Sequence, residues 1–329
     1  MFRILSLGGG GCRGLIQCCI LVKLEELLQE KTGNPKARVI DYFDFVAGTS
    51  TGSIVGTMLL LPHRSAKDIL QFYLADLARI FQRAWSLGGW LRPKYYAEPL
   101  EELAEKYCGL TKLSDLPKDK GCLITAYNLT EGKPHFFTNL LKQGHAETKD
   151  FYLKDVIRAS TAAPTYFPPA QVTNLLNKQV YTMLDGGTFA NDPSLCALAE
   201  AAELPMLINK GRNFLMVSIS CGKMDDRDVK NVTNRGKPAW IEPLISILID
   251  GNSATTNHVD RQVFTALGLA DQFFHLNCPL LTASPALDDI RPENLVALQN
   301  DAWAYLNAAP VQVMLDQLVN KLTAKQTLF

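Results

Sequence analysis

The feature that most constrains how this chain can fold is residues 45–54, where Gly-x-Ser-x-Gly lies between two apolar runs. A strand, a tight turn and a helix in that order form a nucleophile elbow, which lifts a serine above the edge of a sheet. Gly48 and Gly52 suit the turn because a Cβ at either position would collide with neighbouring backbone or crowd the hydroxyl. The pattern predicts Ser50 as a nucleophile. A bare Gly-x-Ser-x-Gly also occurs in ordinary loops, so the rest of the chain has to support it.

A second glycine-rich loop occupies residues 8–14, between an apolar strand pattern and a helical pattern. Such a loop leaves backbone N–H groups free at a helix N-terminus, where they attract anionic oxygen. Gly9, Gly11 and Gly14 also satisfy the dinucleotide-binding pattern Gly-x-Gly-x-x-Gly. That fold needs an acidic residue after a second strand, about 20 residues on. The next expected strand, 43–46, leads into the serine turn instead, so an oxyanion hole is the favoured role for the loop.

Strand and helix patterns alternate along the whole chain. The expected strands are 3–7, 43–46, 121–127, 135–138, 180–184, 214–220 and 272–277. The expected helices are 15–28, 53–61, 69–81, 99–107, 153–160, 194–203 and 241–249, with two more after Pro292 and Pro310. This alternation predicts an α/β protein with three layers, α/β/α, and a largely parallel central sheet.

A serine nucleophile needs a base, which is sought at the carboxyl ends of the strands. Asp185 follows an expected strand, and Gly186 and Gly187 after it allow close backbone approach. A plain turn has the same pattern. A histidine after the acid would complete a triad in the order Ser, Asp, His. However, His258 lies in a helical segment and His275 lies inside a strand pattern, so the residues indicate an acidic partner and leave a histidine's role open.

Composition excludes several other classes of protein. The formal charge is +0, the pI is near 6.9, and no Lys/Arg cluster stands out, so nucleic acid is not an expected partner. The eight cysteines contain no Cys-x-x-Cys pair and are expected to be reduced and buried, without a zinc site. The chain enters a glycine run at once, and no apolar run has the length of a membrane span. We therefore expect a cytoplasmic protein whose membrane contact is peripheral.

The aromatic stretch 81–91 contains two tryptophans around Gly-Gly. Such a stretch fits a lid or an interfacial patch that touches lipid. It equally fits side chains that pack on the core, and the sequence leaves both interpretations open.

Three blocks taken together resemble the signatures of the patatin-like phospholipase family: the loop Gly9–Gly14, the elbow Gly48–Gly52, and Asp185-Gly186-Gly187. The stretches 159–169, 185–193, 217–222 and 287–294 also resemble bacterial members. The resemblance thus covers nearly the whole chain. It implies a patatin-like fold in a single domain over 1–329, with a catalytic core at about 1–222 and a C-terminal helical extension at about 223–329.

The resemblance also implies a chemistry. Ser50 would attack an ester carbonyl while Asp185 takes its proton and later helps water to cleave the acyl-enzyme, with no histidine, metal or organic cofactor. The N–H groups implied for the oxyanion hole are those of Gly10, Gly11, Cys12 and Arg13. Arg13 would also hold the loop or meet the lipid phosphate. Two positions depart from the family pattern, Gly8 before the glycine run and Asp192 in place of a second Asn.

The implied function is that of a lipid acyl hydrolase of the phospholipase A type, acting on phospholipids at the inner membrane surface. Two alternatives stay open. An alcohol in place of water at the acyl-enzyme would make the protein an acyltransferase. Some bacterial relatives are phospholipase effectors of antiphage defence that are activated by cyclic nucleotides, which would add a small-molecule activator, although no binding motif for one is visible.

Overall fold

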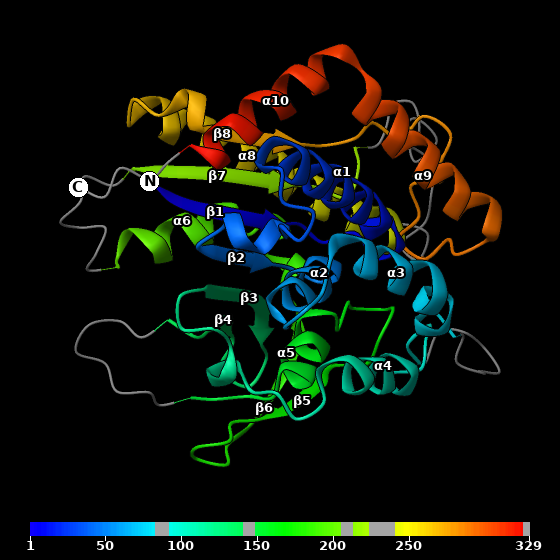
Figure 1. Cartoon of the computed structure of the whole chain (residues 1–329). Helices are drawn as coiled ribbons and strands as arrows, with labels where there is room; N and C mark the ends of the chain where they lie inside the picture. Colours follow the sequence, from blue (N-terminus) through cyan, green and yellow to red (C-terminus); the bar gives the residue numbers. More distant parts are fainter. Residues whose placement is uncertain (83–91, 141–148, 205–212, 224–240, 325–329) are drawn as a thin grey trace.

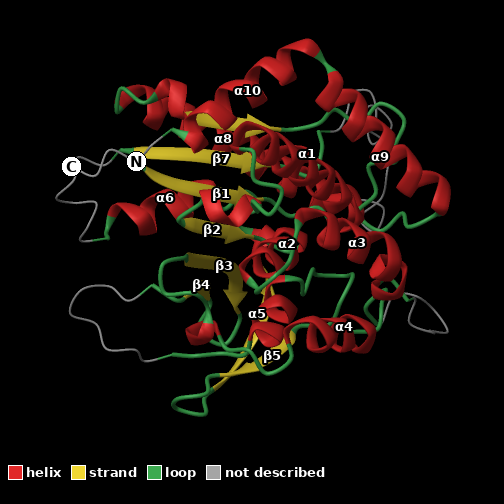
Figure 2. Cartoon of the chain, in the orientation of Figure 1, coloured by secondary structure: helices red, strands yellow, loops and turns green. Residues whose placement is uncertain are grey.

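The computed structural model describes residues 1–82, 92–140, 149–204, 213–223 and 241–324, with side chains from residue 244 onward in the last stretch. The aromatic stretch with its two tryptophans, apart from residues 81 and 82, lies outside the described residues. Most of the polar loop after residue 223 does so as well. Figures 1 and 2 show the described helices and strands assembled around one central sheet.

Within the described residues, eight strands form one mixed sheet in the order β5-β6-β3-β2-β1-β7-β8, with β4 beside β3. The parallel part consists of β3 (Gly121–Asn128), β2 (Phe45–Gly48), β1 (Phe2–Leu7), β7 (Phe214–Ile219) and β8 (Phe273–Leu276). The antiparallel strands are β4 (Lys133–Thr138), β5 (Ala170–Thr173) and β6 (Val180–Asp185). Figure 1 shows β8, β7, β1 and β2 side by side, with their arrows pointing the same way. The predicted largely parallel sheet is confirmed.

Both faces of the central strands are buried, which explains why these strands read as continuous apolar runs. All six residues of β1 are buried. Phe2 and Ile4 face one core together with α6 (Ser194–Ala202) and α8 (Ile241–Ala266), and Leu5 and Leu7 face a larger one. The larger core lies beneath α1 (Gly14–Thr32), α9 (Pro292–Asn307) and α10 (Ala309–Thr323). Helices therefore cover the sheet on both sides, as the predicted three layers require.

The helices around the serine turn begin and end where sequence signals place them. In α2 (Thr51–Leu60) every residue is buried, and the helix ends just before Pro62. Next, α3 (Ala66–Ile80) begins with a capping box in which the side chain of Ser65 accepts a hydrogen bond from the N–H of Asp68. The remaining helices of this half are α4 (Glu98–Cys108) and α5 (Leu153–Ser160).

Two elements differ from the sequence prediction. The helix expected at 241–249 is α8 (Ile241–Ala266), with 26 residues. Gly251 and the polar residues after it look like a helix end, but some of those side chains are held by tertiary hydrogen bonds described below. The strand β5 was not predicted, because only four residues follow a run of prolines. Its pairing with β6, not its own pattern, makes it a strand.

The residues after 223 share the central sheet, since β8 pairs with β7. Pro292 and Pro310 lie in the first turns of α9 and α10, where proline is tolerated in a helix. Among the helices in the described part of the chain, none combines the length and the apolar character needed to cross a membrane.

Candidate active site

Ser50 lies on the turn between β2 and α2 and has a strained backbone. Its φ is +53° and its ψ is −122°, a region that residues other than glycine rarely adopt. Gly52 sits so close to the end of β1 that a Cβ there would lie 2.1 Å from a backbone carbonyl oxygen. A Cβ on Gly48 would lie 2.5 Å from the carbonyl oxygen of Gly52. The steric reason predicted for both glycines is confirmed.

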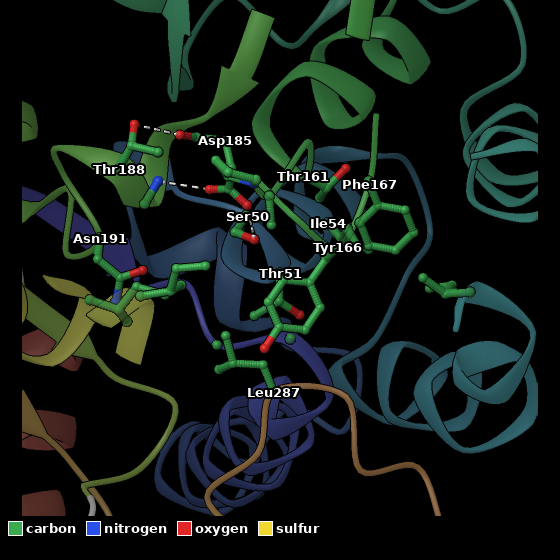
Figure 3. Close-up of a pocket in the computed structure, with 18 of the residues that line it drawn as sticks. Ser50, Thr51, Ile54, Thr161, Tyr166, Phe167, Asp185, Thr188, Asn191 and Leu287 are labelled. Carbon is green, nitrogen blue, oxygen red and sulfur yellow. Dashed lines mark hydrogen bonds between the residues drawn. The ribbon is translucent and has the colours of Figure 1, made fainter. Parts of the chain in front are cut away.

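The side chains of Ser50 and Asp185 meet at the carboxyl end of the sheet. Ser50 Oγ donates a hydrogen bond of 2.6 Å to Asp185 Oδ2. The other carboxylate oxygen, Oδ1, accepts one of 2.7 Å from the N–H of Gly187. Thr188 Oγ1 donates to the Asp185 carbonyl oxygen at 2.9 Å, as Figure 3 shows. Both oxygens of the carboxylate are therefore oriented, and one of them points at the serine hydroxyl.

Asp185 is buried, with 4% of its surface exposed, and this burial changes the pKa of its carboxyl. Burial raises the pKa of its carboxyl from 3.8 to about 7, although the hydrogen bonds from Ser50 and Gly187 oppose the shift. A carboxylate with a pKa near neutrality is a better proton acceptor than an exposed aspartate. The site thus has an acidic group suited to general base catalysis.

Neither candidate histidine lies at the pocket that holds Ser50. His258 is an exposed residue of α8. His275 lies on β8, where its Nδ1 is 3.1 Å from the Ser218 hydroxyl oxygen. Among the described residues that line the pocket there is no histidine, so none of them supplies a third member of a Ser-Asp-His triad.

The glycine loop runs from the end of β1 past the serine. Gly10 and Gly11 line the pocket, and among the described residues no acceptor is found for the N–H of either. The N–H of Cys12 donates to the Leu287 carbonyl oxygen at 2.7 Å, and that of Arg13 donates to the Gly10 carbonyl oxygen at 3.2 Å. Of the four N–H groups implied for an oxyanion hole, two are thus free within the described residues and two are engaged.

The Arg13 side chain is buried and does not line the pocket. Its Nε makes a long contact of 3.5 Å with the Gly10 carbonyl oxygen. A Cβ on Gly10 would lie 2.2 Å from Cys221 Cβ, and one on Gly14 would lie 2.5 Å from Thr51 Oγ1. The bond from Arg13 thus joins two residues of the loop, and both roles implied for Arg13, holding the loop and meeting a lipid phosphate, stay predictions.

Asn191 connects the glycine loop to α8. Its carbonyl oxygen accepts from the N–H of Gly9 at 3.0 Å, and its Nδ2 donates to Ser253 Oγ at 2.9 Å. Its own N–H donates to Asn252 Oδ1 at 2.7 Å. Asn252 Nδ2 in turn donates to the carbonyl oxygen of Phe189 at 2.6 Å. The sequence showed residue 191 only as part of a helix start and did not single out the two α8 residues.

Ser160, at the end of α5, is a further residue that the sequence did not single out. Its Oγ accepts a hydrogen bond of 2.9 Å from the N–H of Ser50. The run of small residues from 159 to 163 was the available signal, because small side chains permit such close approach. The bond ties the strained turn to the end of α5.

The pocket beside Ser50 and Asp185, the pair that we call the dyad, has a volume of about 240 Å³ and is apolar except near that pair. Figure 3 shows Asn191 on one side of Ser50 and the rings of Tyr166 and Phe167 on the other. Its apolar walls come from α2, α3, α4, the segment 163–167, α8 and Leu287, and include Ile54, Leu77, Ile80, Phe81, Leu100, Ala163, Pro164, Tyr166, Phe167, Ile245, Leu248 and Ile249. Such a cavity accepts a hydrocarbon chain with one reactive polar end.

The cysteine side chains are neither paired in disulfides nor part of a metal site in the described residues. All eight cysteines are free, and seven are buried. Burial raises the pKa of Cys12 and Cys221, the two nearest the glycine loop, to about 12, so both are neutral thiols. Over the described stretches, no group of three or more His, Cys, Asp or Glu side chains is arranged to hold a metal ion.

The chain is similar to a known protein family, to sequence relatives in plants and to a solved bacterial structure. The family model described as patatin-like phospholipase matches residues 5–197. Patatin-like protein 2 of Arabidopsis thaliana is 32% identical over 98% of this chain and 86% of its own length. Probable inactive patatin-3-Kuras 1 of Solanum tuberosum is 30% identical over 91% of this chain and 84% of its own length. VipD from Legionella pneumophila, a solved structure, aligns with a TM-score of 0.48 and 14% identity over 96% of this chain and 66% of its own.

Proposed function

The chain belongs to the patatin-like phospholipase family, and from this premise we propose that it is a lipid acyl hydrolase of the phospholipase A type. The observation that carries the proposal is the 2.6 Å hydrogen bond from Ser50 to a buried Asp185 at the head of an apolar pocket. Membership alone would not suffice, because one relative carries the name "Probable inactive patatin-3-Kuras 1". The site geometry supports an active member.

The proposed reaction proceeds through an acyl-enzyme. Ser50 Oγ attacks the ester carbonyl carbon while Asp185 accepts the hydroxyl proton. The free N–H groups of Gly10 and Gly11 stabilise the oxyanion, and those of Cys12 and Arg13 join them only if they leave their present acceptors. Asp185 then donates its proton to the departing alkoxide, which leaves as the lysolipid.

Water completes the cycle through the same two steps, with water as the attacking group and Ser50 Oγ as the leaving group. Asp185 removes a proton from water as its oxygen attacks the acyl carbonyl, and the second oxyanion occupies the same N–H groups. Collapse of this intermediate breaks the bond to Ser50 Oγ, which regains its proton from Asp185. The fatty acid leaves and the dyad returns to its starting state. Neither half of the proposed cycle calls for a metal or an organic cofactor.

The size of the pocket indicates how the substrate lies. Sites for drug-sized ligands measure roughly 300–1,000 Å³, so a cavity of about 240 Å³ suits part of a phospholipid and not the whole molecule. We place one acyl chain in the pocket, with its ester carbon at Ser50. The head group and the second chain then stay outside, which requires the protein to meet its substrate at a lipid surface.

Fatty-acid release from mixed phospholipid vesicles, measured by mass spectrometry, tests the proposal. Wild type should release fatty acid, and Ser50→Ala and Asp185→Asn should each abolish release while the fold stays intact. Asp155→Asn is a matched control, because this α5 carboxyl also has its pKa raised by burial but does not line the pocket. Full activity in either dyad variant would overturn the proposed mechanism. A soluble short-chain ester, assayed in parallel, reports on the dyad without any membrane.

A further inference from the structure

An apolar stripe lies on the outer surface of α8. Leu244, Ile247 and Leu248 are 50%, 44% and 54% exposed. Their spacing of three and four residues places them on one side of the helix, and we call these three residues the α8 stripe. The exposed positions that continue it as far as residue 255 are Gly251, Ala254 and Thr255. Over these positions the outer side of α8 carries no charge.

The α8 stripe is continuous with the mouth of the catalytic pocket. Among the described residues that line the pocket, only Thr188 and Leu248 are exposed. Thr188 lies three residues after Asp185, and Leu248 belongs to the stripe. The pocket walls on α3 and α4, by contrast, are buried. Among the described lining residues, those on α3 and α4 are thus buried, and the exposed ones are Leu248 on α8 and Thr188.

Contiguous exposed aliphatic side chains on a folded protein mark a contact site. The occupant follows from what the pocket needs: an acyl chain that enters beside Leu248 avoids water only if it comes directly from a lipid phase. We propose that the α8 stripe docks onto a phospholipid membrane and brings the pocket mouth against the lipid. This inference rests on the proposed lipid hydrolase function and assigns the residues through which the membrane is met.

The chemistry of the stripe also sets the type of membrane contact. The chain has a formal net charge of +0 and the stripe is uncharged, so electrostatic attraction to anionic lipid contributes little. Docking by insertion of aliphatic side chains is insensitive to ionic strength, whereas attraction between exposed charges is screened by salt. Binding should therefore persist on zwitterionic vesicles at high salt.

The test is co-sedimentation of the full chain with phosphatidylcholine vesicles, at low and at high salt. The double variant Leu244→Glu with Ile247→Glu should bind about 30-fold more weakly, because both side chains lose their transfer into lipid and two charges are added. Release of fatty acid from the same vesicles should fall in parallel. Activity on the soluble short-chain ester should stay unchanged, since neither side chain lines the pocket.

A matched control is Val296→Glu with Val313→Glu, which alters equally exposed aliphatic side chains on α9 and α10. This control should bind vesicles as wild type does. The milder pair Leu244→Gln with Ile247→Gln should give a smaller loss of binding and guards against misfolding in the glutamate variant.

Wild-type vesicle binding by the glutamate double variant, or an equal loss in the control, would overturn the docking inference. Binding that disappears at high salt would do the same. If the wild type hydrolyses the soluble ester in any of these cases, the proposed function survives. If it hydrolyses no ester at all, the proposed function fails, and the sedimentation result still decides whether the α8 stripe meets lipid.

Discussion

Asp185→Asn should abolish activity and at the same time increase the stability of the fold. The reason for the gain in stability is that ionising the buried Asp185 carboxyl costs free energy in the folded state. Burial raises the pKa of Asp185 from 3.8 to about 7. Between these two pH values the folded state binds a proton that the unfolded state has lost, so the stability of the wild type falls as the pH rises. Each pKa unit corresponds to about 1.4 kcal/mol, and a shift of about three units gives a cost of roughly 4 kcal/mol at pH 8.

Asparagine removes this cost because it carries no charge at any pH. Its carbonyl oxygen can keep the hydrogen bond from Gly187, and its amide nitrogen can donate to Ser50 Oγ. The free energy of unfolding of Asp185→Asn should match that of the wild type near pH 4, exceed it increasingly up to about pH 7, and stay higher above that. The gain of up to about 4 kcal/mol is an upper figure, because local rearrangement lowers it.

Urea unfolding of wild type and variant at several values between pH 4 and pH 9 measures this difference. The two proteins must be compared with each other, because burial also raises the pKa of Asp260 to about 7 and gives both the same background slope. Ser50→Ala keeps the buried carboxyl and loses one of the bonds that oppose the shift in its pKa, so it should keep the pH dependence. A stability difference that does not change with pH, or a less stable Asp185→Asn at pH 8, would refute the reasoning.

Three further predictions follow from contacts around the serine. For wild type on a soluble ester, kcat/KM should rise with pH through about 7 as Asp185 deprotonates, the pKa being that of the buried carboxyl; a flat profile would exclude it as the base. Gly52→Ala should destabilise the fold by more than about 2 kcal/mol, because the new Cβ would lie 2.1 Å from a carbonyl oxygen. Gly251→Ala has open space around it and should stabilise α8 by up to about 1 kcal/mol. Thermal unfolding of the two variants measures both effects. Asn252→Ala should lower kcat about tenfold with little change in KM, since it loosens the segment that holds the glycine loop; Asn257→Ala on the same helix should leave both constants as they are.

Much of the fold followed from local patterns. Buried strands and amphipathic helices repeat with different periods, and prolines mark the beginnings of α9 and α10. The serine turn could also be predicted, because both of its glycines are needed for short-range steric reasons. A Cβ on Gly48 would collide with the backbone of Gly52, and a Cβ on Gly52 would collide with the neighbouring strand β1. Asp185 was found because it directly follows a strand, and Ser50 because it stands between the two glycines.

The sequence by itself thus determined the parallel α/β architecture, the turn that presents Ser50, and the acidic residue expected to face it. Only the tertiary structure decided that α8 continues past Gly251, that it is tied to Asn191, and that its outer side forms an apolar stripe at the pocket mouth. It also decided that the carbonyl oxygen of Leu287 accepts a hydrogen bond from the N–H of Cys12. The physical reason is the range of the interactions: periodicity and turn chemistry act over a few residues, whereas these contacts join residues more than 50 positions apart.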